Sequence, residues 1–220
     1  MSPAAIDALW LTVRVSILAT VLIALIGVPL AYVLARRRFW GHGAIDLLVT
    51  LPLVLPPTVT GYYLIVLLGR RGWLGAPIYS ATGWSIAFTW YAAIVAATVM
   101  ALPLMVRTGR AAIESVNPDL ERASYTLGRS EWSTALAVTL PLARRGLLAG
   151  IVLSFARALG EFGATLMLAG NIPGKTQTVP LAIYTAVQTG ESAEALGLVL
   201  VLTGLSCIVL IASSRLGGRI

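Results

Sequence analysis

Long apolar stretches separated by short polar segments are the dominant pattern of this sequence. Five windows are each long enough for a helix that crosses a bilayer, which needs about 20 mostly apolar residues at roughly 1.5 Å per residue. They cover residues 9–35, 47–68, 85–106, 147–169 and 196–213. The pattern predicts one all-α integral membrane domain over residues 1–220, with five transmembrane helices.

Composition supports a membrane protein and narrows its chemistry. Of the 220 residues, 58% are hydrophobic and 11% are charged, whereas soluble domains carry about 25% charged residues. The net charge of +7 is spread between the apolar windows instead of forming one basic face, so nucleic acid is not a predicted partner. Cys207 is the single cysteine, which excludes a disulfide within the chain.

The distribution of Lys and Arg predicts the orientation, because cytoplasmic loops are enriched in both residues. An external N-terminus and an internal C-terminus leave three basic residues outside, namely Arg70, Arg71 and Lys175. The cytoplasmic segments then hold eleven arginines: Arg36, Arg37, Arg38, Arg107, Arg110, Arg122, Arg129, Arg144, Arg145, Arg215 and Arg219. We therefore expect a multi-pass protein with its N-terminus outside.

The second window contains three prolines, Pro52, Pro56 and Pro57. Each proline removes a backbone donor and disturbs the preceding turn, so this helix must bend or break. Irregular backbone at membrane depth is tolerated where it is buried in protein or lines a watery cavity. Both a pathway lining and a simple kink buried between helices remain open.

The segment 107–145, called here the polar loop, is far longer than a connection between adjacent helices requires. Asn117 and Pro118 are typical of a helix start, and Asp119 and Glu121 suit the positive end of its dipole. We expect a short helix from Pro118 to about residue 127, ended by Gly128 in a left-handed conformation. A second amphipathic stretch over 132–141 completes a hairpin. Periodicity alone allows either a membrane-surface anchor or a contact with a soluble partner.

The spacing within this hairpin resembles the EAA loop of ABC importer permeases. Glu121, Ala123 and Gly128 are followed, after nine residues, by Val138, Leu140 and Pro141. Arg122 stands where the family commonly has Ala, and Val138 where it commonly has Ile. In that family the loop fits a groove of the nucleotide-binding subunit, which implies that residues 119–128 form a coupling helix. The residues implied to dock the ATPase are Asp119, Glu121, Arg122, Ala123, Leu127, Gly128, Leu140 and Pro141.

The same resemblance implies the remaining architecture. It is the type I ABC importer permease fold, working as a pair of identical chains with two copies of a separate ATPase subunit. ATP and Mg²⁺ would be bound in that ATPase, and no cofactor by this chain.

Further blocks are similar to the molybdate permeases within that family. They are the sequences at 51–57 (LPLVLPP), 69–72 (GRRG), 103–107 (PLMVR), 158–164 (ALGEFGA) and 171–174 (NIPG). Sulfate permeases share the LGEFGA block and a related IPG segment, so the double-proline stretch followed by GRRG is what favours molybdate. The resemblance implies import of molybdate across the cell inner (plasma) membrane from an external molybdate-binding protein, with tungstate or sulfate as alternative substrates.

Arg157 and Glu161 lie one turn apart within the fourth window. Charges inside a membrane are costly and usually face a bundle interior or water, which makes them functional candidates. The alternative is a mutually neutralising pair that locks helix packing. The predicted pathway or gate residues are Pro56, Pro57, Arg157, Glu161 and Asn171.

Three other functions are disfavoured. Residues 169–176 (AGNIPGKT) fit a relaxed phosphate-loop pattern, but Pro173 removes one N–H and the segment follows a spanning helix instead of a strand. A membrane-embedded enzyme would need an acidic pair or a nucleophile with a nearby base, and the apolar windows offer neither. A passive channel would not need a rigid polar loop.

Residues 178–188 are too short to span, so we expect a helix at the external surface.

Overall fold

The computed structural model describes residues 2–217. Met1 and residues 218–220 lie outside this range, and with them Arg219, one of the arginines predicted on the cytoplasmic side. Within it every regular element is helical, as the sequence predicts. The elements are α1 (Pro3–Arg36), α2 (His42–Val54), α3 (Pro57–Leu68), α4 (Gly75–Thr82), α5 (Trp90–Glu114), α6 (Pro118–Thr126), α7 (Glu131–Thr134), the π-helix η1 (Ala135–Thr139), α8 (Leu140–Leu159), α9 (Gly163–Ala169), α10 (Val179–Gln188) and α11 (Ser192–Gly217).

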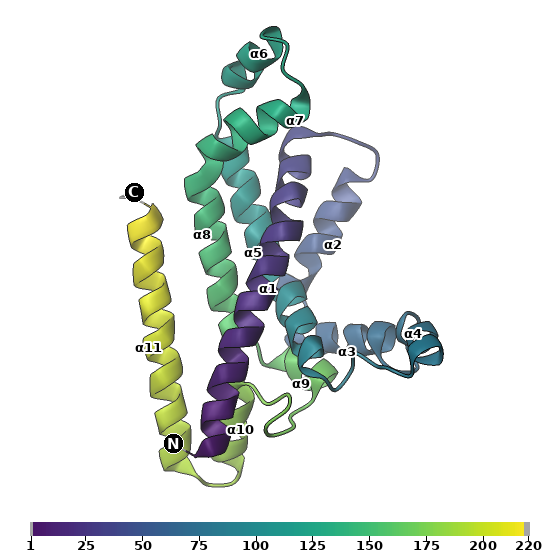
Figure 1. The fold of residues 1–220 in the computed structure, drawn as a ribbon, viewed down its shortest axis with the longest axis vertical. Helices are drawn as coiled ribbons and strands as arrows, with labels where there is room; N and C mark the ends of the chain where they lie inside the picture. The colour runs from purple at the N-terminus through teal and green to yellow at the C-terminus, as the bar shows by residue number, and fades with distance from the viewer. Residues whose placement is uncertain (1, 218–220) are drawn as a thin grey trace.

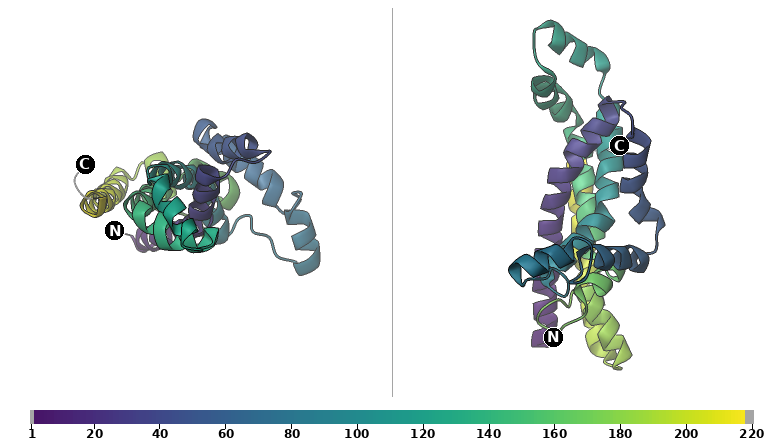
Figure 2. Two further views of the ribbon diagram at one scale, coloured as in Figure 1. Left: turned by 90° about the horizontal axis from the view of Figure 1, so that it is seen from above. Right: turned by 90° about the vertical axis from the view of Figure 1, so that its right-hand side faces the viewer.

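Four helical stretches in the described part of the chain are long and apolar enough to cross a membrane. They are Pro3–Arg36, Trp90–Glu114, Glu131–Leu159 and Ser192–Ile211. Figure 1 shows α1, α5 and α8 side by side, with α11 along the flank of α8. The α6–α7 hairpin extends from one end of this bundle, and α10 lies at the other end beside the start of α1 (Figure 2).

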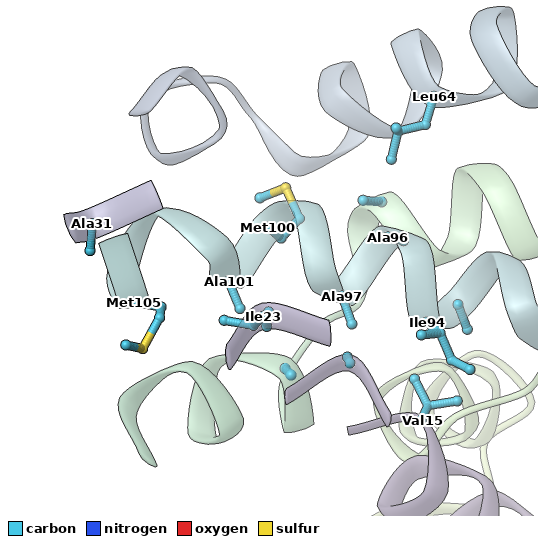
Figure 3. Close-up of a cluster of buried hydrophobic side chains, with 14 of the residues drawn as sticks. Val15, Ile23, Ala31, Leu64, Ile94, Ala96, Ala97, Met100, Ala101 and Met105 are labelled. Atoms are coloured by element: carbon cyan, nitrogen blue, oxygen red, sulfur yellow. The ribbon is translucent and has the colours of Figure 1, made fainter. Parts of the chain in front are cut away.

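Small residues let the central helices approach closely. Ala19 of α1 and Ala93, Ala97 and Ala101 of α5 are at most 1% exposed. Figure 3 shows Ala97 and Ala101 in the buried cluster that also contains Ile23, Met100 and Met105. A methyl group added at Gly27 of α1 would lie only 2.8 Å from Cγ of Met105. In a membrane, where apolar burial gives little drive for helix association, close packing of this kind holds helices together.

The window 47–68 does not form one helix, as its prolines predict. α2 ends at Val54, Leu55 and Pro56 are non-helical, and α3 begins at Pro57. α3 leaves the line of α2 at a steep angle and runs sideways towards α4 (Figure 1). Pro56 lacks the N–H that would continue the ladder of α2, whereas Pro57 occupies the first turn of α3, where no N–H is needed.

The predicted helix over 147–169 differs from the structure at both ends. The continuous helix begins earlier, at Glu131 of the polar loop, and stops at Leu159. Residues 160–162 are non-helical, and α9 then covers only Gly163–Ala169. Hydropathy could not detect this break, because the sequence stays mostly apolar on both sides of it.

Candidate functional site

The polar loop forms the predicted short helix with the predicted ends. Oδ1 of Asn117 accepts a hydrogen bond from the N–H of Asp119 at 2.9 Å, and Pro118 occupies the first turn. Gly128 follows with φ of 78°, and its N–H bonds to the carbonyl of Tyr125 at 2.9 Å. This left-handed position satisfies the end of α6 and favours glycine.

Glu121 is buried and faces the rest of the chain instead of solvent. Its Oε1 lies 3.0 Å from Nε of Arg36, the last residue of α1, and accepts a hydrogen bond from the hydroxyl of Thr139 at 2.5 Å. Nη2 of Arg36 also donates to the carbonyl of Val116 at 3.2 Å. One carboxylate therefore ties α6 to the end of α1 and to the π-helix that leads into α8.

A second ion pair holds the other arm of the hairpin. Arg37 donates from Nε and Nη2 to both oxygens of Glu131, at 3.0 and 2.7 Å. Between the two arms, the hydroxyls of Ser124 and Thr134 are hydrogen-bonded at 2.9 Å. We call the set Arg36, Arg37, Glu121, Glu131 and Thr139 the hairpin clamp. It makes the hairpin a fixed extension of α1 and α8.

The outward face of α6 is partly apolar. Leu127 is 81% exposed, and Leu120 and Tyr125 are also exposed. Arg122 and Asp119 pair at 3.0 Å on the same face, with both side chains largely open to solvent. Tyr125 is not fully open to solvent: partial burial, followed by the charges of Glu121 and Glu131, raises its pKa above the usual 10.0. Like an ordinary tyrosine, its hydroxyl is neutral at physiological pH.

The predicted docking residues therefore separate into two groups. Asp119, Arg122, Ala123, Leu127, Gly128 and Pro141 are exposed, whereas Glu121 is buried and Leu140 is half-buried. Sequence reasoning missed the exposed Leu120 and Tyr125 as well as the clamp partners Arg36, Arg37 and Thr139. The adjacent arginines at the end of the first window were a signal, but their partners lie about 85 to 94 residues away.

The break after α8 is organised around Glu161. Its Oε1 accepts a hydrogen bond from the N–H of Ala164 at 2.9 Å, at the start of α9. Its Oε2 lies 2.8 Å from Nη1 of Arg157, one turn back on α8. The carboxylate is almost completely buried, while the Arg157 side chain is 29% exposed. The pair therefore bridges the two helices across the break, with the guanidinium on the more open side.

The two helix breaks lie against each other. A methyl group added at Gly163 would lie 2.8 Å from Cβ of Pro57. One at Gly61 of α3 would lie 2.8 Å from Cα of Ala164 and 2.7 Å from Cβ of Met167. The structure thus brings the proline break of the second window and the Glu161 break together, although about 100 residues separate them in sequence.

The hydrogen bonds of Asn171 go to α10 and to its own loop, not to the junction of the two helix breaks. Its Nδ2 donates to the hydroxyl of Thr185 at 2.9 Å, and its Oδ1 accepts from Nε2 of Gln177 at 2.9 Å. These bonds fasten the loop after α9 to α10, the short helix predicted at 178–188.

Sequence reasoning also missed Arg14 of α1, whose guanidinium lies 4.1 Å from the ring centre of Trp90. A lone arginine inside an apolar window was the available signal.

The family described as "binding-protein-dependent transport system inner membrane component" matches residues 27–219. The chain belongs to this family. Among its relatives, the molybdenum transport system permease protein ModB of Escherichia coli K12 is 47% identical over 191 residues, 86% of this chain and 83% of ModB. The putative molybdenum transport system permease protein YvgM of Bacillus subtilis is 40% identical over 200 residues, 91% of this chain and 88% of YvgM.

A sulfate permease and solved transporter structures are also similar. The sulfate transport system permease protein CysW of Synechococcus elongatus is 34% identical over 97% of this chain and 74% of its own. The inward-facing MetNI methionine ABC transporter gives a TM-score of 0.75 at 18% identity, covering 99% of this chain and 98% of the other. A bacterial alginate ABC importer gives a TM-score of 0.78 at 17% identity, covering 100% of this chain and 81% of the other. These structures establish the fold of an ABC importer permease; as a transport subunit, the chain is not itself an enzyme.

Proposed function

We propose that this chain is the permease subunit of an ABC importer that moves molybdate into the cytoplasm. The 47% identity to the E. coli molybdenum permease over most of both chains carries the proposal. The likeness to the sulfate permease, at 34%, makes sulfate the second candidate substrate. Molybdate and sulfate are both tetrahedral dianions, so a pathway for one differs little from a pathway for the other.

In this proposal the chain crosses the inner membrane five times, with the N-terminus outside and the C-terminus inside. α2 and α3 together make the second crossing, and α8 and α9 the fourth. The polar loop then lies in the cytoplasm, where the exposed face of α6 docks the ATPase. Two copies of the chain pair with two ATPase subunits that hold ATP and Mg²⁺, and an external binding protein delivers the anion.

The hairpin clamp supports a mechanism for coupling. α7, η1 and α8 form one continuous helix from Glu131 to Leu159, and the clamp ties α6 to that helix and to α1. A displacement of α6 by the ATPase therefore moves two membrane helices instead of deforming a flexible loop. α8 ends at the Glu161 break, so this movement reaches the junction with Pro57. Arg157, with its partly open guanidinium, is the residue we place beside the passing anion.

ATP-driven uptake in proteoliposomes tests the proposal. Vesicles containing this chain, its ATPase and its binding protein are loaded with ATP and given labelled molybdate, with molybdate, tungstate or sulfate as unlabelled competitors. We expect molybdate accumulation that needs ATP and is inhibited least by sulfate. Stronger competition by sulfate than by molybdate would make it a sulfate permease. Uptake without ATP would contradict the importer itself and favour a passive channel.

A further inference from the structure

A cavity of about 800 Å³ lies between the end of α3, α4 and the segment leading into α5. Its lining includes Arg70, Arg71, Trp73, Tyr79 and Ser85. These residues are outside the α6 face and the Glu161 junction described above. In the proposed topology, the connection from α3 to α5 is on the external side, where the substrate arrives.

The positive charge of this cavity is not neutralised by its own segment. Residues 47–113 contain no Asp or Glu. Within residues 2–211, whose side chains the structure describes, no carboxylate forms an ion pair with Arg70 or Arg71. The buried hydroxyl of Ser85 also has no hydrogen-bond partner in that part of the chain. The cavity thus offers two guanidinium groups that no carboxylate in that part of the chain pairs with.

The turn that carries the two arginines is rigid. A methyl group at Gly69, Gly72 or Gly75 would lie within 2.5 Å of a backbone oxygen, so the turn closes only with glycine at these three positions. The guanidinium carbon of Arg70 lies 4.0 Å from the ring centre of Tyr79, and Nη2 hydrogen-bonds the hydroxyl of Tyr79. Stacking and hydrogen bonding hold Arg70 in place, which leaves Arg71 as the freer cation.

The nearby end of α3 does not oppose an anion strongly. The last carbonyls of a helix carry partial negative charge, but those of Ile65, Val66 and Leu67 accept hydrogen bonds from the N–H groups of Gly69, Trp73 and Leu74. Arginine offers several donors in a planar fork that matches oxyanions, and it is more weakly hydrated than lysine. These properties favour a small oxyanion as ligand.

We propose that the Arg70–Arg71 cavity is a binding site for a tetrahedral oxyanion at the external mouth of the permease. This rests on the proposed function and adds a site within the permease itself, between the binding protein and the membrane pathway. The cavity is much larger than such an anion, so the ligand keeps part of its hydration shell and binds weakly. A transport pathway needs such a site, because an anion held tightly would not move on.

Equilibrium binding of labelled molybdate to the permease–ATPase complex in nanodiscs, without ATP and without binding protein, tests the site. Arg71→Gln removes the freer cation, and Lys175→Gln is the matched control, since Lys175 is an exposed basic residue predicted on the same side but outside the cavity. We expect Arg71→Gln to weaken binding at least tenfold and Lys175→Gln to change it less than twofold. Size-exclusion profiles and circular dichroism of both variants check that they fold.

Several results would overturn the site. They are absence of binding to the unmodified complex, or equal effects of the two variants. A separate capture assay with the binding protein adds a third: loss of capture in Arg71→Gln with anion binding intact would make the cavity a protein-docking surface. Failure of the proposed function is distinguishable, because uptake and binding are measured separately. Binding without ATP-driven uptake contradicts the importer, whereas uptake with Arg71-independent binding contradicts only the site.

Discussion

Nε of Arg36, at the end of α1, lies 3.0 Å from Oε1 of Glu121 in α6, and both side chains are mostly buried. The same carboxylate oxygen accepts a hydrogen bond from the hydroxyl of Thr139. The glutamate of the EAA-like pattern is therefore an internal brace in this chain. In the proposed docking of an ATPase, its effect would be indirect, through the position of α6, and the contact would be made by exposed residues such as Leu120, Arg122 and Leu127.

The Arg36–Glu121 pair should show strong energetic coupling. In a double-mutant cycle with Arg36→Ala and Glu121→Ala, we expect a coupling free energy of roughly 1–3 kcal/mol in the unfolding of the detergent-solubilised permease. The Arg122–Asp119 pair is the control, because it has the same 3.0 Å separation but exposed side chains. That pair should contribute less than about 1 kcal/mol. Equal coupling energies for the two pairs would contradict the role of burial.

Gly128→Ala should loosen the end of α6 by backbone strain alone. The φ of 78° is unfavourable for a residue with a side chain, yet an added methyl group meets no atom within 4 Å. We expect a local cost of about 1 kcal/mol, faster amide hydrogen exchange over residues 124–129, and less co-purified ATPase. Gly197→Ala, in α11 and also unobstructed, is the control and should leave exchange in the loop unchanged. Unaltered exchange and assembly in Gly128→Ala would refute this prediction.

The junction of the two breaks should be intolerant of added volume. Gly163→Ala places a methyl group 2.8 Å from Cβ of Pro57, and overpacking of this kind costs about 1–3 kcal/mol. We expect a lower Tm and reduced uptake. Gly160→Ala, three residues earlier, meets no atom within 4 Å and should change stability by about 0.5 kcal/mol or less. If both substitutions lowered Tm equally, the contact between α3 and α9 would not be the cause.

A substitution at Arg157 distinguishes a role of the Arg157–Glu161 ion pair in the pathway from a role in helix packing. Arg157→Met keeps the apolar stem but removes the charge beside Glu161. We expect ATP-driven uptake to fall at least tenfold while the yield of assembled transporter stays within twofold. Arg145→Met, on an exposed part of the same helix, should leave both unchanged. Parallel loss of uptake and assembly in Arg157→Met would favour a pair that only locks α8 to α9.

Features that depend on neighbouring residues were predictable from the sequence. The bounds of α6 agree with the prediction because Asn117, Pro118 and Gly128 act within one turn of the helix that they delimit. The break of the second window was expected for the same reason, since Pro56 removes a local N–H. The third window, 85–106, was placed less well: α5 runs from Trp90 to Glu114, because its helix continues into the polar loop, which hydropathy does not register.

The sequence by itself determined that this chain is a helical membrane protein with a capped helix in its polar loop, because hydropathy and capping act over one or a few turns. Only the tertiary structure decided that Glu121 faces Arg36 and Thr139 instead of a partner, that Glu161 bridges a break in the fourth window, and that this break meets Pro57. Apart from the local bridge made by Glu161, these relationships join residues roughly 20 to 100 positions apart. Such pairings depend on how packed helices are placed in space, and local periodicity carries no record of that placement.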